Sequence, residues 1–251
     1  MSFPSLLLLG FIAGATIIIG LAVGRLKSFN PTARSALTML ATGILVFLLV
    51  DILGSAMGQA TSALPKNAPE GAALVALIVV GFLFGFVSLV MFENRWIKGQ
   101  EAVAAERLSL MIALGIGLHN LSEGLAIGQS YLQGEIGLSV TLLVGFALHN
   151  ATEGFGIVGP MVRQGVRPSW GNLLLLAAIG GGPTFVGTVL GSLWTSTYLS
   201  VFVLAVAGGA LLYVIKELFA HVRKDANQVA IMASVVLGFA LGWGTDLIAS
   251  L

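Results

Sequence analysis

The sequence predicts an all-α polytopic membrane protein with eight transmembrane helices, and three observations support this fold class. Hydrophobic residues make up 57% of the chain and charged residues only 9%, against about a quarter in soluble domains, and the mean hydropathy is +1.00. Apolar runs of the roughly 20 residues that a membrane-crossing helix needs recur along the whole chain. Basic residues gather in every second loop. One membrane domain covering residues 1–251 is therefore expected.

The composition also excludes several classes of protein. Twelve Lys and Arg residues face eleven Asp and Glu residues, for a net charge of +1, so the chain has no basic surface that could hold nucleic acid. It has no cysteine, which rules out disulfides, thiolate metal sites and iron–sulfur clusters. Any metal bound here must have nitrogen and oxygen ligands.

Eight apolar runs, separated by charged residues and by Pro, Gly or Asn clusters, mark the predicted spans. They lie near residues 4–24, 37–58, 71–92, 108–130, 136–160, 171–193, 198–220 and 229–249. The first run is too long for a signal peptide and has no basic segment before it, so it is predicted to be a span. The loops are too short for a soluble domain, and the stretch 93–107 is either a linker or an interfacial helix.

The positions of the basic residues predict the orientation of the chain. Eleven of them follow odd-numbered spans: Arg25, Lys27, Arg34, Arg95, Lys98, Arg107, Arg163, Arg167, Lys216, Arg223 and Lys224. Only Lys66 falls on the other side. The positive-inside rule places the eleven in the cytoplasm and both termini outside. A bacterial or archaeal inner or plasma membrane is the expected location.

Spans four and five share a motif. The pattern Gly-x-x-Leu-His-Asn-x-x-Glu-Gly occurs at 115–124 and again thirty residues later at 145–154. Because these spans cross the membrane in opposite directions, the second copy is inverted relative to the first. An inverted repeat indicates an approximate two-fold axis in the plane of the bilayer. The expected arrangement is therefore 3+2+3, with spans four and five between two three-span repeats.

Each motif lies near mid-bilayer and places a His and a Glu four residues apart on one helix face, with an Asn beside them. The six residues are His119, Asn120, Glu123, His149, Asn150 and Glu153. An acid at the centre of a span costs about 2.5–3.5 kcal/mol, so these groups need partners or a cation. Nitrogen and oxygen donors with two carboxylates suit a divalent first-row metal. Helix packing alone would explain His and Asn, but two acids at equivalent positions favour a metal or proton site.

Other polar residues are weaker candidates for a pathway or a secondary metal position. Glu217 and His221 share a helix face at the cytoplasmic end of span seven, either as an exit relay or as an ordinary helix end. Asp51 stands alone in the outer half of span two. Asp246, near the end of span eight, is expected only to reach water. Gly182 and Pro183 interrupt span six, either at a cavity or at a simple packing kink.

These residues resemble the ZIP (Zrt-, Irt-like protein) family of divalent metal transporters, and in particular its GufA-like branch. The resemblance covers most of the chain: eight spans, outside termini and the paired His-Asn-x-x-Glu-Gly motifs. It implies that His119, Glu123, His149 and Glu153 are the primary metal ligands. It also implies that Asn120 and Asn150 face a second metal position, with Glu153 bridging the two.

The chain departs from the family pattern at several positions. Ser122 and Thr152 replace the usual Pro before the motif Glu, and Lys216 stands where span seven usually has an acid. Gly182 replaces the usual Glu before Pro183, so one bound metal is expected rather than two. The loop after span three lacks the His-rich insertion of many relatives, so no metal-sensing loop is expected there.

The predicted function is transport of a divalent transition metal, with Zn²⁺ first and Fe²⁺, Mn²⁺, Co²⁺ or Cd²⁺ as further substrates. Alternating access is the expected mechanism: spans four and five hold the ion while the flanking three-helix groups rock around it. No prosthetic group is expected, and the partners are the ion and the lipid bilayer. Closely spaced Gly and Ala in spans two and three are compatible with a homodimer and equally with internal packing. The alternatives are an intramembrane metal-dependent hydrolase, a channel, and a metal-binding protein without carrier activity.

Overall fold

The computed structural model describes residues 2–23, 25, 31–96, 104–220 and 227–249, which form ten helices and no strand. The helices are α1 (Phe3–Ala15), α2 (Ile17–Val23), α3 (Pro31–Ala63), α4 (Ala68–Trp96), α5 (Ala104–Leu132), α6 (Ile136–Arg163), α7 (Trp170–Gly180), α8 (Gly182–Leu193), α9 (Thr197–Ala220) and α10 (Gln228–Ala249). The predicted all-helical class is confirmed.

Two of the predicted spans are each divided into two helices, so the ten helices correspond to eight spans. Span six breaks at Gly181, between α7 and α8, because Pro183 has no N–H to continue the helical hydrogen bonds. Span one breaks at Thr16, between α1 and α2, where the Thr16 hydroxyl donates to the Ala13 carbonyl. The first of these breaks was predicted from the sequence and the second was not.

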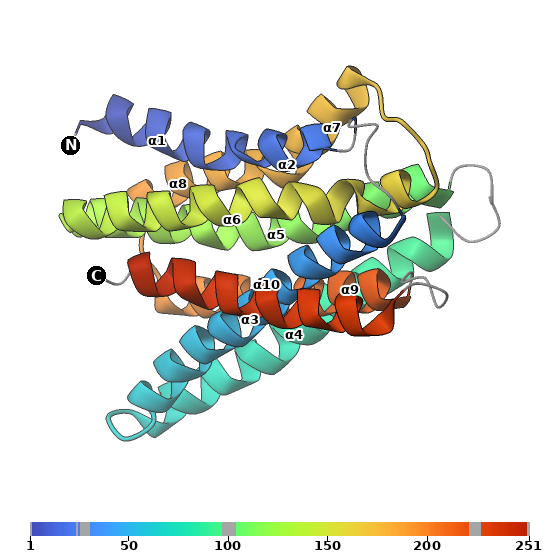
Figure 1. Cartoon of the computed structure of the whole chain (residues 1–251). Coiled ribbons are helices and arrows are strands. Elements are labelled where there is room, and N and C mark those ends of the chain that lie inside the picture. Colours follow the sequence, from blue (N-terminus) through green and yellow to red (C-terminus); the bar gives the residue numbers. More distant parts are fainter. Residues whose placement is uncertain (1, 24, 26–30, 97–103, 221–226, 250–251) are drawn as a thin grey trace.

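Six of the described segments are long and apolar enough to cross a membrane. They are Phe3–Val23, Ser35–Ala63, Ala68–Arg95, Ala105–Leu132, Trp170–Leu193 and Thr197–Ala220. The apolar part of α10 over Gln228–Gly244 is shorter, and the polar motif of α6 lowers the hydropathy of that helix. The start of α1 and the end of α10 lie at the same end of the bundle (Figure 1), as an even number of crossings requires.

Two equivalent helix–helix contacts, one made by α5 and one by α6, agree with the inverted repeat of the sequence. A Cβ atom on Gly124 of α5 would lie 2.1 Å from the Thr184 carbonyl oxygen of α8. A Cβ atom on Gly154, the matching glycine of the second motif, would lie 2.4 Å from the Ile17 carbonyl oxygen of α2. Helix α5 therefore packs on the second half of span six in the same way that α6 packs on the second half of span one.

The two broken spans meet at their breaks. A Cβ atom on Gly14 would lie 2.2 Å from the Gly181 carbonyl oxygen, and one on Gly181 would lie 2.1 Å from the Gly14 carbonyl oxygen. This reciprocal contact shows that Gly14 and Gly181 occupy equivalent positions. The approximate two-fold axis therefore passes between them.

The helices form two groups, seen as an upper and a lower part of Figure 1. One group contains α1, α2 and α5–α8, and the other contains α3, α4, α9 and α10. The most extensive contacts, α5 with α8, α4 with α9 and α3 with α10, lie within a group. This grouping corrects the expectation of two flanking three-helix units, because each three-span repeat gives one span to the first group and two to the second.

Backbone contacts at glycines hold each group together. Gly85 and Gly209 bring α4 and α9 into backbone contact, and Gly43 and Gly238 do the same for α3 and α10. Glycines that face the other group, such as Gly115, Gly156 and Gly159, lie closest to side chains there rather than to backbone atoms. The largest buried apolar cluster, with members on α3, α5, α6 and α9, fills this boundary. The groups thus interlock within themselves more closely than with each other.

Candidate metal site

The first half of the candidate site lies on α5. His119 and Glu123 are one helical turn apart, and His119 Nε2 lies 3.1 Å from Glu123 Oε1. Both residues are buried. The i, i+4 spacing directs both side chains to the same face of the helix, as the motif predicted.

The second half comes from α6, which packs beside α5. Glu153 Oε1 lies 3.6 Å from His119 Nε2, and His149 Nδ1 lies 4.0 Å from Glu123 Oε1. His149 and Glu153 are buried as well. The structure therefore brings the four ionisable residues of the two motifs together at one place.

Several polar atoms in this cluster have no hydrogen-bond partner among the described residues. They include both ring nitrogens of His119, both carboxylate oxygens of Glu123, and Glu153 Oε1. A buried polar group left without a partner costs about 1–3 kcal/mol, and more when it is charged. Imidazole nitrogens and carboxylate oxygens gathered at one buried point form a donor set that zinc accepts.

The distances between the His and Glu side chains are close to those between two ligands of one zinc ion, but the side chains do not yet surround a common ion position. Two atoms bound to a tetrahedral zinc ion at about 2.1 Å lie roughly 3.4 Å apart, and the His119–Glu123 and His119–Glu153 distances bracket this value. No three His, Asp or Glu residues in the described part of the chain are already placed around a single ion position. Ion binding therefore requires these side chains to adjust.

The motif asparagines contact the two helix breaks. Asn120 Nδ2 donates to Glu153 Oε2 at 3.1 Å and to the Gly180 carbonyl at 2.9 Å. Asn150 Nδ2 donates to the Ala13 carbonyl at 3.0 Å. Both asparagines are completely buried. Each therefore ties a motif helix to the break of a divided span, a contact that the sequence did not reveal.

Ser122 and Thr152 occupy the positions where Pro was expected. The Ser122 hydroxyl donates to the His119 carbonyl at 2.6 Å, and the Thr152 hydroxyl donates to the His149 carbonyl at 2.7 Å. Hydroxyls that bond back to the preceding turn in this way tend to bend helices slightly. The two residues therefore modify the backbone turn that carries each histidine.

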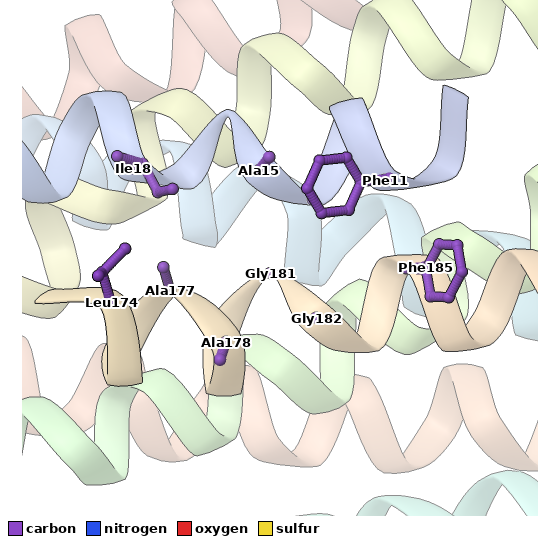
Figure 2. A pocket seen from close by; sticks show the side chains of 10 residues that line it. Phe11, Ala15, Ile18, Leu174, Ala177, Ala178, Gly181, Gly182 and Phe185 are labelled. Carbon is purple, nitrogen blue, oxygen red and sulfur yellow. The ribbon is translucent and has the colours of Figure 1, made fainter. Parts of the chain in front are cut away.

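Gly182 lies at the edge of an apolar groove between α1–α2 and α7–α8 (Figure 2), where Phe11, Ile18 and Phe185 also line the surface. A side chain added at Gly182 would meet nothing within 4 Å. Helix α8 contains no acidic residue. The carboxylates of the cluster therefore come from α5 and α6.

The secondary candidates are separated from one another. Asp51 on α3 and Asp246 on α10 are both exposed on the surface of the bundle. Glu217 is buried and forms an ion pair with Lys216, whose Nζ lies 3.8 Å from Glu93 Oε2. His221 lies outside the described residues.

The fold and the cluster together define a class of protein: a polytopic membrane transporter whose central ionisable residues come from an inverted repeat. A family model described as ZIP zinc transporter matches residues 97–244. The chain is also 31% identical to the zinc transporter GufA of Myxococcus xanthus over 190 residues, which cover 71% of this chain and 73% of that protein. The chain belongs to the ZIP family. It is a transporter of divalent metal rather than an enzyme, which excludes the hydrolase alternative.

Proposed function

We propose that the protein moves Zn²⁺ across the membrane by alternating access, with His119, Glu123, His149 and Glu153 as ligands of one central ion. The observation that carries the proposal is the convergence of two equivalent, buried His–Glu pairs, with His119 Nε2 lying 3.1 Å from Glu123 Oε1 and 3.6 Å from Glu153 Oε1. Zinc is the metal in the names of the matching family and relative. Fe²⁺, Mn²⁺, Co²⁺ and Cd²⁺ are further candidate substrates with compatible ligand chemistry.

The carboxylate and imidazole ligands are proposed to have different roles in binding. The carboxylates of Glu123 and Glu153 balance the two positive charges of the ion, which removes the cost of carrying it through a medium of low dielectric constant. The imidazoles of His119 and His149 favour borderline metals such as zinc over the harder Mg²⁺ and Ca²⁺, which prefer oxygen. Because α8 offers no acid, one ion at a time is proposed.

Movement between the two helix groups would expose the ion to alternate sides. All four proposed ligands lie on α5 and α6, in the group that also contains α1, α2, α7 and α8. The site would then move as part of one closely packed body against α3, α4, α9 and α10. Asp51 on α3 and Glu217 on α9 belong to the second group and are proposed as pathway residues.

The orientation and location are part of the proposal. The basic residues that follow odd-numbered spans support cytoplasmic odd-numbered loops and outside termini. A bacterial or archaeal inner or plasma membrane is the proposed location.

The test is metal flux into proteoliposomes that contain a fluorescent zinc reporter. The intact protein is compared with a variant carrying Glu123→Ala and Glu153→Ala. Saturable flux with the intact protein and its loss in the variant are expected, because removal of both carboxylates leaves the ion charge uncompensated. Saturation also separates a carrier from a channel.

A second double variant, Glu106→Ala with Glu135→Ala, is the matched control. It removes two acids from the start of α5 and the residue before α6, so its change in charge is the same, but both positions are exposed. Its flux should equal that of the intact protein. Absence of flux in the intact protein for zinc, iron, manganese and cobalt alike would overturn the proposed function.

A further inference from the structure

Asn120 lies between two groups that can only accept hydrogen bonds. Its amide nitrogen is 3.1 Å from Glu153 Oε2 and 2.9 Å from the Gly180 carbonyl oxygen. A carbonyl oxygen and a carboxylate oxygen each accept, so the side-chain group that faces them must be the NH₂ group, which has two hydrogens to donate. The chemistry of the neighbours therefore fixes which way the amide points.

The Gly180 carbonyl is available because the helix is broken there. In a continuous helix this oxygen would accept from the N–H of Thr184. The N–H of Thr184 instead donates to the Gly181 carbonyl at 3.1 Å, and Pro183 has no N–H to offer. The break between α7 and α8 thus supplies a backbone acceptor next to Asn120.

The second motif repeats only half of this arrangement. Asn150 donates to the Ala13 carbonyl at the break of span one, and Ala13 and Gly180 each precede one of the two glycines that meet at the pseudo-two-fold axis. Asn120 also holds a carboxylate, whereas both oxygens of Glu123 lack a hydrogen-bond partner among the described residues. The repeat therefore contains one asparagine that contacts a candidate ligand and one that does not.

We propose that Asn120 is a positioning residue for Glu153 and not itself a metal ligand. Its amide is fixed to the backbone at Gly180 and holds Glu153 Oε2, which leaves Glu153 Oε1 directed toward His119 and free to bind the ion. The orientation of this ligand is thereby coupled to the break in span six. This inference rests on the proposed function, since it assumes that Glu153 binds a metal.

The energetic consequence follows from the burial of both groups. Glu153 is 1% exposed and Asn120 is 0% exposed, so no solvent can replace the bond between them. Without Asn120 the carboxylate loses its fixed rotamer and one donor. Partners that orient a metal ligand in this way commonly change metal affinity about 10- to 100-fold.

The test is Co²⁺ binding to the full-length protein in detergent, followed by the visible absorption of the bound ion. Asn120→Ala should weaken binding about 10- to 100-fold, and the spectrum at saturation should be unchanged because the same atoms coordinate the ion. Asn150→Ala is the matched control, since it removes an equivalent amide and an equivalent backbone bond. Its effect on affinity should be at least several-fold smaller.

A second variant separates positioning from direct coordination. Asn120→Asp keeps the shape of the side chain but replaces the donor with a carboxylate that repels Glu153 and the Gly180 carbonyl, so binding should weaken. If Asn120 were a ligand through Oδ1, which has no hydrogen-bond partner among the described residues, the aspartate would bind the ion as well or better. Equal or tighter binding, or a changed spectrum at saturation in Asn120→Ala, would overturn the proposal.

The remaining outcomes are also decisive. Unchanged affinity in Asn120→Ala would exclude a positioning role while leaving the proposed function intact. Failure of the intact protein to bind Co²⁺ or Zn²⁺ would instead refute the metal site as a whole. The melting temperature of each variant is measured alongside, and the Asp variant, with no change in volume, carries the test if Asn120→Ala does not fold.

Discussion

Four ionisable side chains meet in the middle of the described bundle, and each is no more than 5% exposed. His119 is nearest to both glutamates, at 3.1 Å from Glu123 and 3.6 Å from Glu153. Two carboxylates so close together in a buried site are unfavourable unless a cation or protons neutralise them. At the scale of single residues, the two carboxylates therefore need neutralisation, either by the proposed metal ion or by protons.

The two histidines should set the preference between metals. His119→Asn or His149→Asn replaces a ring nitrogen with an amide oxygen, which suits Mn²⁺ better than Zn²⁺. The ratio of zinc to manganese flux should fall roughly tenfold in either variant, equivalent to about 1.4 kcal/mol. Competition between the two metals in proteoliposomes measures this ratio. An equal loss of flux for both metals would show that the imidazoles do not select the ion.

At the scale of helices, close backbone contact organises the group that carries the site. Lipid tails are as apolar as leucine side chains, so helices in a bilayer associate through packing and polar contacts rather than through hydrophobic burial. Gly124 of α5 and Gly154 of α6 allow such contact with α8 and α2. Each of these glycines follows the motif Glu directly, so helix packing and ligand position depend on the same turn of helix.

Two glycine-to-alanine substitutions should differ in their effects on stability. A Cβ atom on Gly124 would lie 2.1 Å from a backbone oxygen, whereas one on Gly156 would first meet the Ala41 side chain at 3.7 Å. Gly124→Ala should therefore destabilise the protein by about 1–3 kcal/mol through overpacking. Gly156→Ala should be neutral or stabilise it by up to about 1 kcal/mol, because alanine favours the helix.

Thermal unfolding of both variants in the same detergent measures the difference. A lower melting temperature is expected for Gly124→Ala alone. Similar melting temperatures for the two variants would contradict the tight packing of α5 on α8.

At the scale of the whole molecule, the boundary between the two groups decides how the site can open. Within each group, glycines bring helix backbones into direct contact, while the boundary consists mainly of side chains such as Met39, Met111 and Leu211. Side-chain packing can rearrange at lower cost than interlocked backbones. Relative movement of the groups is therefore the expected route to alternating access.

A disulfide across this boundary should stop transport. The pair Ala41→Cys and Gly156→Cys joins α3 to α6, and the Cβ separation of 3.7 Å suits a disulfide. The chain contains no other cysteine, so oxidation acts only on this pair. Zinc flux should be lost on oxidation and restored by a reductant.

The two single-cysteine variants, treated in the same way, are the controls. Both should retain flux under oxidising and reducing conditions. Undiminished flux in a fully cross-linked double variant would show that α3 and α6 do not move apart during transport.

The sequence by itself determined the spans, the inverted motif and the likeness to the ZIP family. Hydropathy is a local property, because each segment must satisfy the bilayer along its own length. The repeat of His119 and Glu123 as His149 and Glu153 can be recognised without knowing how the helices pack. The break at Pro183 was also predictable, since proline removes a backbone donor wherever it occurs.

Only the tertiary structure decided which helices pack together and what the polar residues contact. The break at Thr16 and the bonds from Asn120 to Gly180 and from Asn150 to Ala13 could not be read from any local pattern. The division of each three-span repeat between two groups also became visible only in the contacts. The physical reason is that every span is comparably apolar, so hydropathy cannot choose among partners, and the choice falls to close steric fit at residues such as Gly14 and Gly181.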